Sequence, residues 1–402
     1  MTSFIFYSFL TLGILLGSHY ILYFTTVRVF NINRTGVKRT LQFAVAVLMI
    51  SYFLSAIFLR LSSNLVTIIF SWISSLWMGL WLHLLPVLPV FWLVVAITKN
   101  EKSAPSMRTA FGVFVGLALA VTVYGALNAF SVTVKRLDVQ LADLPDHWNG
   151  KTVVQLSDVH LGSIRGLRFL RGVIDKVNDL EPDLIFITGD LFDGMGANLH
   201  TFAEPLRELS ASRDVFFVTG NHEGYLGLTE PLATVEQAGM RILNDEVVEL
   251  DGLQIAGASF PEFSTANKTR SVARMGEAID PTKPCILLYH TPTDVAESSS
   301  GRAEQQASTY LEPDIDFSFA RKFRVDLQLS GHTHEGQIFP FTYLTQWIFG
   351  GYHYGLHEID GFSLYITSGT GTWGPPLRTG SKSEIVAITL RQPTPLSRSP
   401  QP

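Results

Sequence analysis

Cysteine is almost absent from this sequence, and charged residues are scarce. The 402 residues include one cysteine, Cys285, which excludes an intrachain disulfide framework and a cysteine-rich zinc module. Cys285 lies in the apolar run 285–288, where a thiol behaves as a small buried hydrophobe. Only 16% of the residues are charged, 47% are hydrophobic, and the mean hydropathy is +0.24. Soluble proteins carry about 25% charged residues, so this composition indicates that part of the chain lies in a membrane.

Positive charge is not in excess either. The formal net charge is -5 at pH 7, whereas a domain that binds nucleic acid normally has a basic stripe on its surface. We therefore expect no nucleic-acid-binding surface. The chain also shows no internal repeat, so a repeat architecture is not indicated.

The longest stretches without a charged residue lie in the first third of the chain. No Asp, Glu, Lys or Arg occurs in residues 1–27, 40–59, 61–98 or 109–134. About 20 apolar residues suffice for a helix to cross a bilayer, and a soluble core does not lack charge over such lengths four times in succession. The first stretch lacks the positively charged N-terminal region of a signal peptide, and further apolar segments follow it. It is therefore not typical of a cleaved signal peptide. We predict a transmembrane region of about four helices in residues 1–130.

The third stretch, residues 61–98, is longer than one crossing of a bilayer core of about 30 Å requires. It contains Pro86 and Pro89. One long helix, kinked or partly interfacial, is the preferred interpretation, and a tight hairpin of two short spans is the alternative. His83 is expected to be a tolerated polar residue that faces neighbouring helices, with a proton relay as the alternative.

Basic residues between the predicted spans indicate the orientation. Four lie between the first and second spans, three follow the third, and only Arg60 separates the second from the third. By the positive-inside rule the two basic loops are cytoplasmic, so four spans place everything after residue 130 on the extracytoplasmic face. A hairpin at residues 61–98 would put one basic loop on the wrong side. The basic residues are Arg28, Arg34, Lys38, Arg39, Lys99, Lys102 and Arg108.

Residues 131–390 have the patterns of an α/β domain. Alternating apolar residues predict a half-buried strand at 131–143. Short apolar runs and helical spacing then alternate, which is typical of a parallel βαβ core. The predicted strands are 152–157, 184–190 and 215–221, and the predicted helices are 166–179, 199–209 and 229–238.

After residue 242 the pattern changes to strands. Asp251-Gly252 predicts a two-residue hairpin turn. The polar segment 294–318 is longer than an ordinary loop, which predicts a functional or disordered segment, and the proline-rich tail 391–402 is expected to be disordered. The predicted strands are 247–250, 254–259, 285–289, 325–330, 362–367 and 385–390.

Residues of metal-ligand type follow the predicted strand ends. One Asp after a strand is usually a cap or turn former, and one His is usually structural. Several such residues at successive strand ends indicate a shared site, because the carboxyl ends of parallel strands meet at one edge of a sheet. Oxygen and imidazole ligands without a thiolate favour Mn, Fe, Zn, Ni or Co over a structural zinc. The residues are Asp158, His160, Asp190, Asn221, His290, His332 and His334.

These residues stand in five blocks that resemble the calcineurin-like metallophosphoesterases. The family blocks D-x-H, G-D, G-N-H, H and G-H-x-H occur here in order, at 158–160, 189–190, 220–222, 290 and 331–334. The chain is most similar to the membrane-linked branch that ends in Ser-Gly-x-Gly, here 368–371. The resemblance implies a four-layer α-β-β-α sandwich in residues 131–390, preceded by the all-α transmembrane region.

The resemblance also implies two divalent metal ions, about 3.5–4 Å apart. Asp190 would bridge them. His222 resembles the family's histidine that binds no metal and protonates the leaving oxygen, and Asp193 matches the acidic residue that orients it. Ordinary loop polarity is the alternative for both. The implied ligands are Asp158, His160 and His334 for one ion, and Asn221, His290 and His332 for the other.

Three further features bear on the substrate. Arg378 is expected to bind a substrate phosphate, with a surface arginine as the alternative. Residues 352–354 would either rim a pocket or lie among lipid headgroups. Glu335 departs from the branch, which usually has two glycines after G-H-x-H, and a carboxylate there would either repel an anionic substrate or point into solvent.

The resulting hypothesis is a membrane-anchored phosphohydrolase. It would hydrolyse a phosphodiester or pyrophosphate by metal-activated hydroxide, and tethering at the bilayer favours a lipid-linked substrate. The alternatives are a phosphomonoesterase, or a phosphodiesterase for a soluble or wall-polymer ester. A membrane receptor or scaffold that retains only the fold would have lost ligands, and none is missing.

Overall fold

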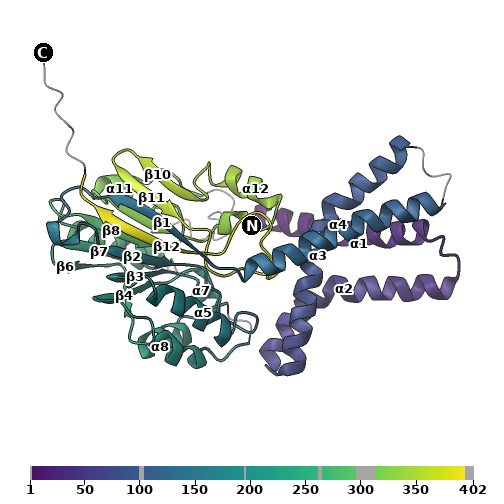
Figure 1. Ribbon diagram of the computed structural model, residues 1–402, viewed down its shortest axis with the longest axis horizontal. Coiled ribbons are helices and arrows are strands. Elements are labelled where there is room, and N and C mark those ends of the chain that lie inside the picture. The colour runs from purple at the N-terminus through teal and green to yellow at the C-terminus, as the bar shows by residue number, and fades with distance from the viewer. Residues whose placement is uncertain (1, 99–103, 194–195, 261–264, 296–312, 394–402) are drawn as a thin grey trace, which may run out of the picture. The chain divides into compact units, whose positions relative to one another are not determined.

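The computed structural model describes residues 2–98, 104–193, 196–260, 265–295 and 313–393 of the protein (Figure 1). Two compact units divide the described residues. The first contains the chain up to Ala129 together with 196–197 and Gly374–Thr379, and the second contains the rest from Phe130 onward.

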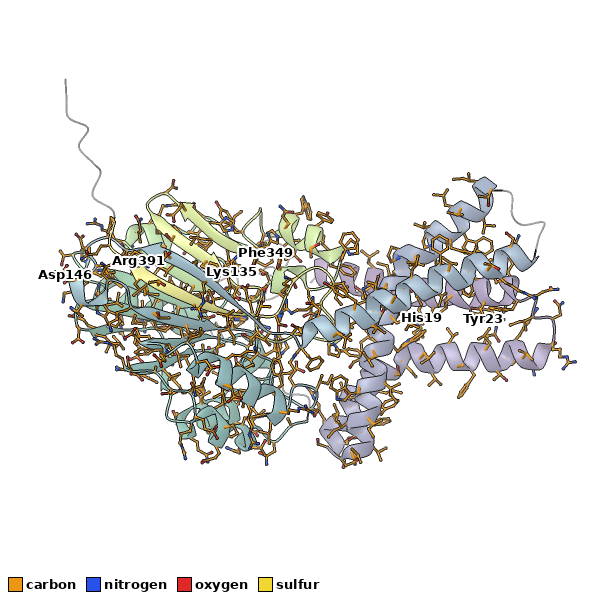
Figure 2. All side chains as sticks on the ribbon, viewed as in Figure 1. His19, Tyr23, Lys135, Asp146, Phe349 and Arg391 are labelled. Atoms are coloured by element: carbon orange, nitrogen blue, oxygen red, sulfur yellow. The ribbon has the colours of Figure 1, made fainter. Side chains whose placement is uncertain are left out.

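Long apolar helices form the first unit. The described residues include four helices with the length and hydropathy needed to cross a membrane, and their side chains are almost all carbon (Figure 2). Helix α3 continues through Pro86 and Pro89, so the preferred single helix is confirmed and the hairpin of two spans is wrong. The helices are α1 (Thr2–Val29), α2 (Thr35–Leu61), α3 (Leu65–Thr98) and α4 (Ala104–Ala129).

Polar side chains inside this unit pair with one another. His83 Nδ1 of α3 lies 2.9 Å from Thr122 Oγ1 of α4, which confirms that His83 faces a neighbouring helix. Trp92 Nε1 donates to Thr25 Oγ1 of α1 at 2.8 Å. Such pairs avoid the cost of unpaired polar groups among apolar helices.

The second unit is built on two six-stranded sheets. In the first sheet β2 to β5 are parallel, β12 pairs antiparallel with β2, and β1 pairs parallel with β12. The order of the strands across the sheet is β1 (Thr133–Gln140), β12 (Glu384–Arg391), β2 (Thr152–Leu156), β3 (Leu184–Thr188), β4 (Asp214–Val218) and β5 (Arg241–Ile242).

The second sheet is mixed. Strands β7, β8, β9 and β11 are parallel, and β6 and β7 form the predicted antiparallel hairpin. Asp251 and Gly252 have φ of 46° and 83°, the positive values that a tight two-residue hairpin turn requires. The order is β10 (Gly355–Ile359), β11 (Phe362–Ile366), β9 (Leu327–Ser330), β8 (Cys285–Tyr289), β7 (Leu253–Ala258) and β6 (Glu246–Leu250).

The main core lies between the sheets. Inward side chains from both sheets, such as Phe186 of β3 and Leu288 of β8, form one buried apolar cluster. A second cluster joins the outer face of the second sheet to Met275 and Phe319. Helices therefore cover both outer faces, and the expected α-β-β-α sandwich is confirmed (Figure 1). The helices are α5 (Leu167–Asn178), α6 (Ala203–Leu206) and α8 (Thr229–Gln237) beside the first sheet, and α9 (Thr265–Ala278) and α11 (Ser318–Lys322) beside the second.

Some elements are not apparent in the sequence patterns. Helix α9 lies in a segment whose polar composition hid the apolar spacing of Val272 and Met275. Helix α12 (Phe341–Ile348) and strand β10 were also missed. The predicted helix 199–209 is shorter, a 3-10 turn followed by α6. Residues 296–312 of the predicted long loop and 394–402 of the predicted tail lie outside the described residues.

Candidate functional site

The ends of five parallel strands bring the predicted ligands together. Strands β2, β3 and β4 of the first sheet and β8 and β9 of the second end at one edge of the sandwich, where six of the seven ligands are buried. His332 is half-buried. The ligands that follow the strands are Asp158 and His160 after β2, Asp190 after β3, Asn221 after β4, His290 after β8, and His332 and His334 after β9.

The backbone at these turns is in an unusual conformation. Asp158, His160, Asp190, His332 and His334 have φ between 50° and 71°. Left-handed backbone costs a residue other than glycine about 1–3 kcal/mol and is concentrated at functional sites. The surrounding hydrogen bonds support it, since the His160 N–H donates to the Asp190 carbonyl at 3.1 Å.

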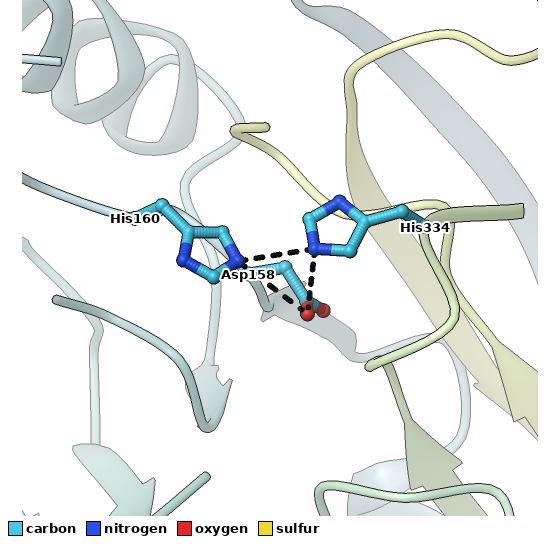
Figure 3. Close-up of side chains that lie close together, drawn as sticks. All are labelled: Asp158, His160 and His334. Carbon is cyan, nitrogen blue, oxygen red and sulfur yellow. Dashed lines mark hydrogen bonds and ion pairs between the residues drawn. The ribbon is translucent and has the colours of Figure 1, made fainter. Parts of the chain in front are cut away.

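Three donor atoms form the first cluster. Asp158 Oδ1 lies 3.2 Å from His334 Nε2, and His334 Nε2 lies 3.0 Å from His160 Nε2. Figure 3 shows the two rings and the carboxylate converging on one point. Two imidazole nitrogens that face each other beside a carboxylate are the donor set of a divalent-metal site.

Three other donor atoms form the second cluster. Asn221 Oδ1 lies 3.0 Å from both His290 Nε2 and His332 Nδ1. The two ring nitrogens are 3.3 Å apart. His332 therefore presents Nδ1 to this cluster, whereas His334 presents Nε2 to the first.

Asp190 lies between the two clusters. Its Oδ2 atom is 3.3 Å from His290 Nε2 in the second cluster and 3.9 Å from His160 Nε2 in the first. Its Oδ1 atom accepts a hydrogen bond from the His222 backbone N–H at 2.8 Å. One carboxylate oxygen thus faces both clusters, and the other fixes the side chain.

Glycines leave room for these donors. A Cβ atom at Gly189 would lie 2.7 Å from His290 Nδ1, and one at Gly220 or Gly331 would overlap the carboxylate of Asp190 or Asp158. No side chain fits at these positions without moving a donor. The glycines of the motif are therefore required by close approach.

Charges within the site keep the carboxylates ionised. Burial raises the pKa of Asp158, but the positive charges of His334 and His290 outweigh it and hold this pKa well below its usual range. Burial likewise opposes ionisation of Asp190, yet its pKa is also held well below the usual range, mainly by His290 and then by His222. Ionised carboxylates are the form that binds a cation.

The histidines differ in their protonation. Burial lowers the pKa of His160 and lowers that of His332 to about 3, so both rings are neutral, as metal ligands must be. Burial acts in the same direction on His290, but the charge of Asp190 outweighs it and raises the pKa of His290 to about 9. His290 must therefore lose a proton to bind a metal.

His222 and Asp193 lie beside the first cluster. Asp193 Oδ1 is 3.6 Å from His222 Nδ1 and 3.7 Å from His160 Nδ1. Burial raises the pKa of Asp193 to about 6, against the opposing charge of His222. The two histidine rings meet edge to face with centroids 4.6 Å apart. This arrangement places the predicted pair at the site, and their catalytic roles stay predictions.

Glu223 is a site residue that the sequence reasoning missed. Its buried carboxylate accepts hydrogen bonds from the backbone N–H groups of Gly220 at 2.8 Å, Asp190 at 2.9 Å and Phe192 at 3.1 Å. It therefore connects the turns after β3 and β4. The signal was available, because Glu223 stands three residues after Gly220, the spacing of a capping box at the start of α7 (Asn221–Leu226).

Replacing Glu223 with glutamine is expected to lower metal affinity about 10–100-fold, as loss of a residue that supports ligands typically does. The glutamine amide would direct N–H groups at N–H donors, which also costs about 1–3 kcal/mol of stability. Metal titration and thermal unfolding measure the two effects. Glu236→Gln, at an exposed position of α8, is the matched control, and an equal metal affinity in both variants would contradict this role.

The backbone of the Ser-Gly-x-Gly segment, residues 368–371, donates hydrogen bonds to the turn that carries Asp158. The N–H of Gly371 donates to the Asp158 carbonyl at 2.7 Å, and that of Thr370 donates to the Ser157 carbonyl at 2.9 Å. Glu384 accepts from Thr367 Oγ1 at 2.8 Å, which holds the start of the segment. This motif therefore positions backbone rather than contributing a ligand.

Arg378 belongs to the first compact unit. Its N–H donates to the Gly125 carbonyl at 2.9 Å, and its carbonyl accepts from Asn128 Nδ2 at 2.9 Å. The side chain is fully buried, so the alternative of a surface arginine is wrong. Phosphate binding by Arg378 stays a prediction.

The aromatic residues at 352–354 have structural partners. Tyr352 packs edge to face on Phe317 with centroids 5.3 Å apart, and the Tyr354 hydroxyl donates to Glu384 at 3.1 Å. These contacts give both tyrosines partners inside the domain, and the two interpretations of residues 352–354 as a pocket rim or a lipid contact stay predictions. Glu335 is half-buried beside His334.

Comparison with known proteins gives consistent matches. The family model "Calcineurin-like phosphoesterase" matches residues 151–336. A metallophosphoesterase of Campylobacter jejuni is 33% identical over 67% of this chain and 66% of its own length. A Danio rerio transmembrane protein with metallophosphoesterase domain is 32% identical over 69% of this chain and 62% of its own length. A Helicobacter pylori metallophosphoesterase is 32% identical over 59% of each chain. The alignments thus span about three fifths to two thirds of these relatives.

Residues 151–336 therefore form a phosphoesterase domain, and the phosphoesterases as a class hydrolyse phosphoric ester bonds. The chain belongs to the calcineurin-like phosphoesterase family. Its apolar helices and its similarity to relatives named as transmembrane proteins indicate a membrane protein.

Proposed function

We propose that the protein is a membrane-anchored phosphohydrolase that uses two divalent metal ions to hydrolyse a phosphodiester or pyrophosphate. The observation that supports this most directly is the pair of three-donor clusters with one oxygen of Asp190 facing both. One ion would be held by Asp158, His160 and His334, and the other by Asn221, His290 and His332. When bound, the ions would neutralise phosphate oxygens and activate water near neutral pH.

The surrounding residues have separate tasks in this proposal. Glu223 and the His222 N–H hold Asp190 in place. The His222 ring contacts the phosphate and gives a proton to the leaving oxygen. Asp193, 3.6 Å from His222 Nδ1, orients that ring.

Metal analysis of the purified protein tests this proposal. We expect two equivalents of Mn, Fe, Zn, Ni or Co per chain, and loss of hydrolysis after chelation with recovery on adding Mn²⁺. A panel of soluble monoesters, diesters and pyrophosphates identifies the bond that is hydrolysed. One equivalent of metal at full activity, or activity that survives complete chelation, would exclude the two-ion site. A clear preference for monoesters would favour the phosphomonoesterase alternative.

We also propose that the catalytic domain faces the extracytoplasmic side. This follows from the basic residues of the loops after α1 and α3. Protease added to intact cells should remove a C-terminal tag, with a cytoplasmic protein as the protected control. A tag that is cleaved only after permeabilisation would place the domain inside.

A further inference from the structure

Helix α12 exposes an apolar face in the second unit. Tyr343, Leu344 and Trp347 are 66%, 50% and 78% exposed. Their spacing of one and four residues places them on the same face of the helix. No residue of α12 is buried, so the helix does not use this face to join the described core of its own domain.

The exposed apolar residues are concentrated in one short segment. Phe339, just before α12, and Phe341, its first residue, are also exposed, at 54% and 36%. Residues 336–357 contain no Asp, Glu, Lys or Arg. Soluble surfaces rarely expose a contiguous apolar patch of this kind, and one without charge marks contact with a membrane or another protein.

Contacts at both ends connect α12 to the metal-ligand turns. A Cβ at Gly336, two residues after His334, would lie 2.6 Å from Thr342 Cα. After the helix, buried Phe349 (labelled in Figure 2) packs edge to face on His332 with centroids 6.2 Å apart. Because α12 has eight residues and is about 12 Å long, its exposed face lies close to the site.

We propose that the face formed by Tyr343, Leu344 and Trp347 lies in the interfacial layer of the bilayer and that the adjoining site hydrolyses phosphate esters carried by lipids. Tyr and Trp are enriched at this depth, and the absence of charge lowers the cost of leaving water. Phe130 directly follows α4, so the chain tethers the domain to the membrane in which its helices reside. The proposed lipid contact does not depend on the protein being a hydrolase, whereas the proposed substrate class rests on the proposed function.

Fluorescence of the full chain in phosphatidylcholine nanodiscs tests the lipid contact. A cysteine-reactive NBD label is attached at Trp347→Cys in a Cys285→Ala background, and Lys176→Cys, at an exposed position of α5, is the matched control. Spin-labelled phosphatidylcholine should quench the label at 347 and not at 176, and iodide should show the reverse. Iodide quenching of both labels would overturn the proposal. A label at 347 that is shielded from both quenchers would also overturn it, because a second copy or another part of the chain would then cover the face.

Activity on two substrates tests the substrate class. Replacing Tyr343, Leu344 and Trp347 together with serine should reduce hydrolysis of a lipid phosphodiester in vesicles about 10-fold or more, because the local substrate concentration falls. Hydrolysis of soluble bis-p-nitrophenyl phosphate should stay at the wild-type level, which also reports that the variant is folded. Equal rates of wild type and variant on the vesicle substrate would overturn the lipid assignment. Wild-type inactivity on every ester would instead contradict the proposed hydrolysis and leave the fluorescence result standing.

Discussion

Asp190→Ala is expected to reduce hydrolysis by on the order of 10³-fold or more. Residues that work together in catalysis lose most of the rate enhancement when one of them is removed, and Asp190 serves both donor clusters. The substitution removes the carboxylate oxygen that lies 3.3 Å from His290 Nε2 and 3.9 Å from His160 Nε2. It also removes the acceptor for the His222 N–H. We therefore expect the metal content to fall together with the rate. Initial rates on a soluble diester and elemental analysis of the same samples measure both.

Asp190→Asn is the matched control for this prediction. Asparagine tolerates the left-handed backbone that Asp190 adopts, with φ of 51°, and it keeps an oxygen that can accept from the His222 N–H. It lacks the negative charge that two cations would share, so we expect metal binding to weaken while folding is retained. Wild-type turnover and two bound metals in Asp190→Ala would exclude a bridging role.

His222→Ala is expected to lower kcat about 10²–10⁴-fold, the range that a general acid contributes, and to leave the metal content unchanged. The reason is geometric. The His222 ring lies beside the first cluster, and its Nδ1 atom faces Asp193 at 3.6 Å, outside both sets of three proposed ligands. The loss should be smaller for p-nitrophenyl esters than for alkyl esters, because a p-nitrophenolate leaves without help from an acid.

The dependence on the leaving group separates proton donation from a structural effect. Asp193→Asn keeps the size of the side chain and removes the charge that orients the ring, so a smaller loss of about 10-fold is expected, within the range of residues that act through another. An equal loss with alkyl and p-nitrophenyl esters, or the release of metal from His222→Ala, would argue against an acid at this position.

Much of the local structure was predictable because it depends on local patterns. Short apolar runs such as 184–188 form strands in any fold that buries both faces of a sheet. Charge-free apolar runs of about 20 residues or longer have few alternatives to a membrane helix. Helix α9 was missed for the same reason, because its polar composition outweighed the weak apolar spacing of Val272 and Met275. Strand β5, with only two residues, has no periodicity to detect.

The sequence by itself determined which residues could bind metal. The order of the blocks and the position of each ligand after a strand follow from the chain alone. Only the tertiary structure decided how these residues combine, because pairing of β3 with β4 and of β8 with β9 joins segments far apart in sequence. The packing of the two sheets against each other then sets one oxygen of Asp190 between two clusters, and the pairing of β3 with β4 lets Glu223 connect two turns. It also leaves α12 exposed, since burial depends on what packs against a helix and not on its composition.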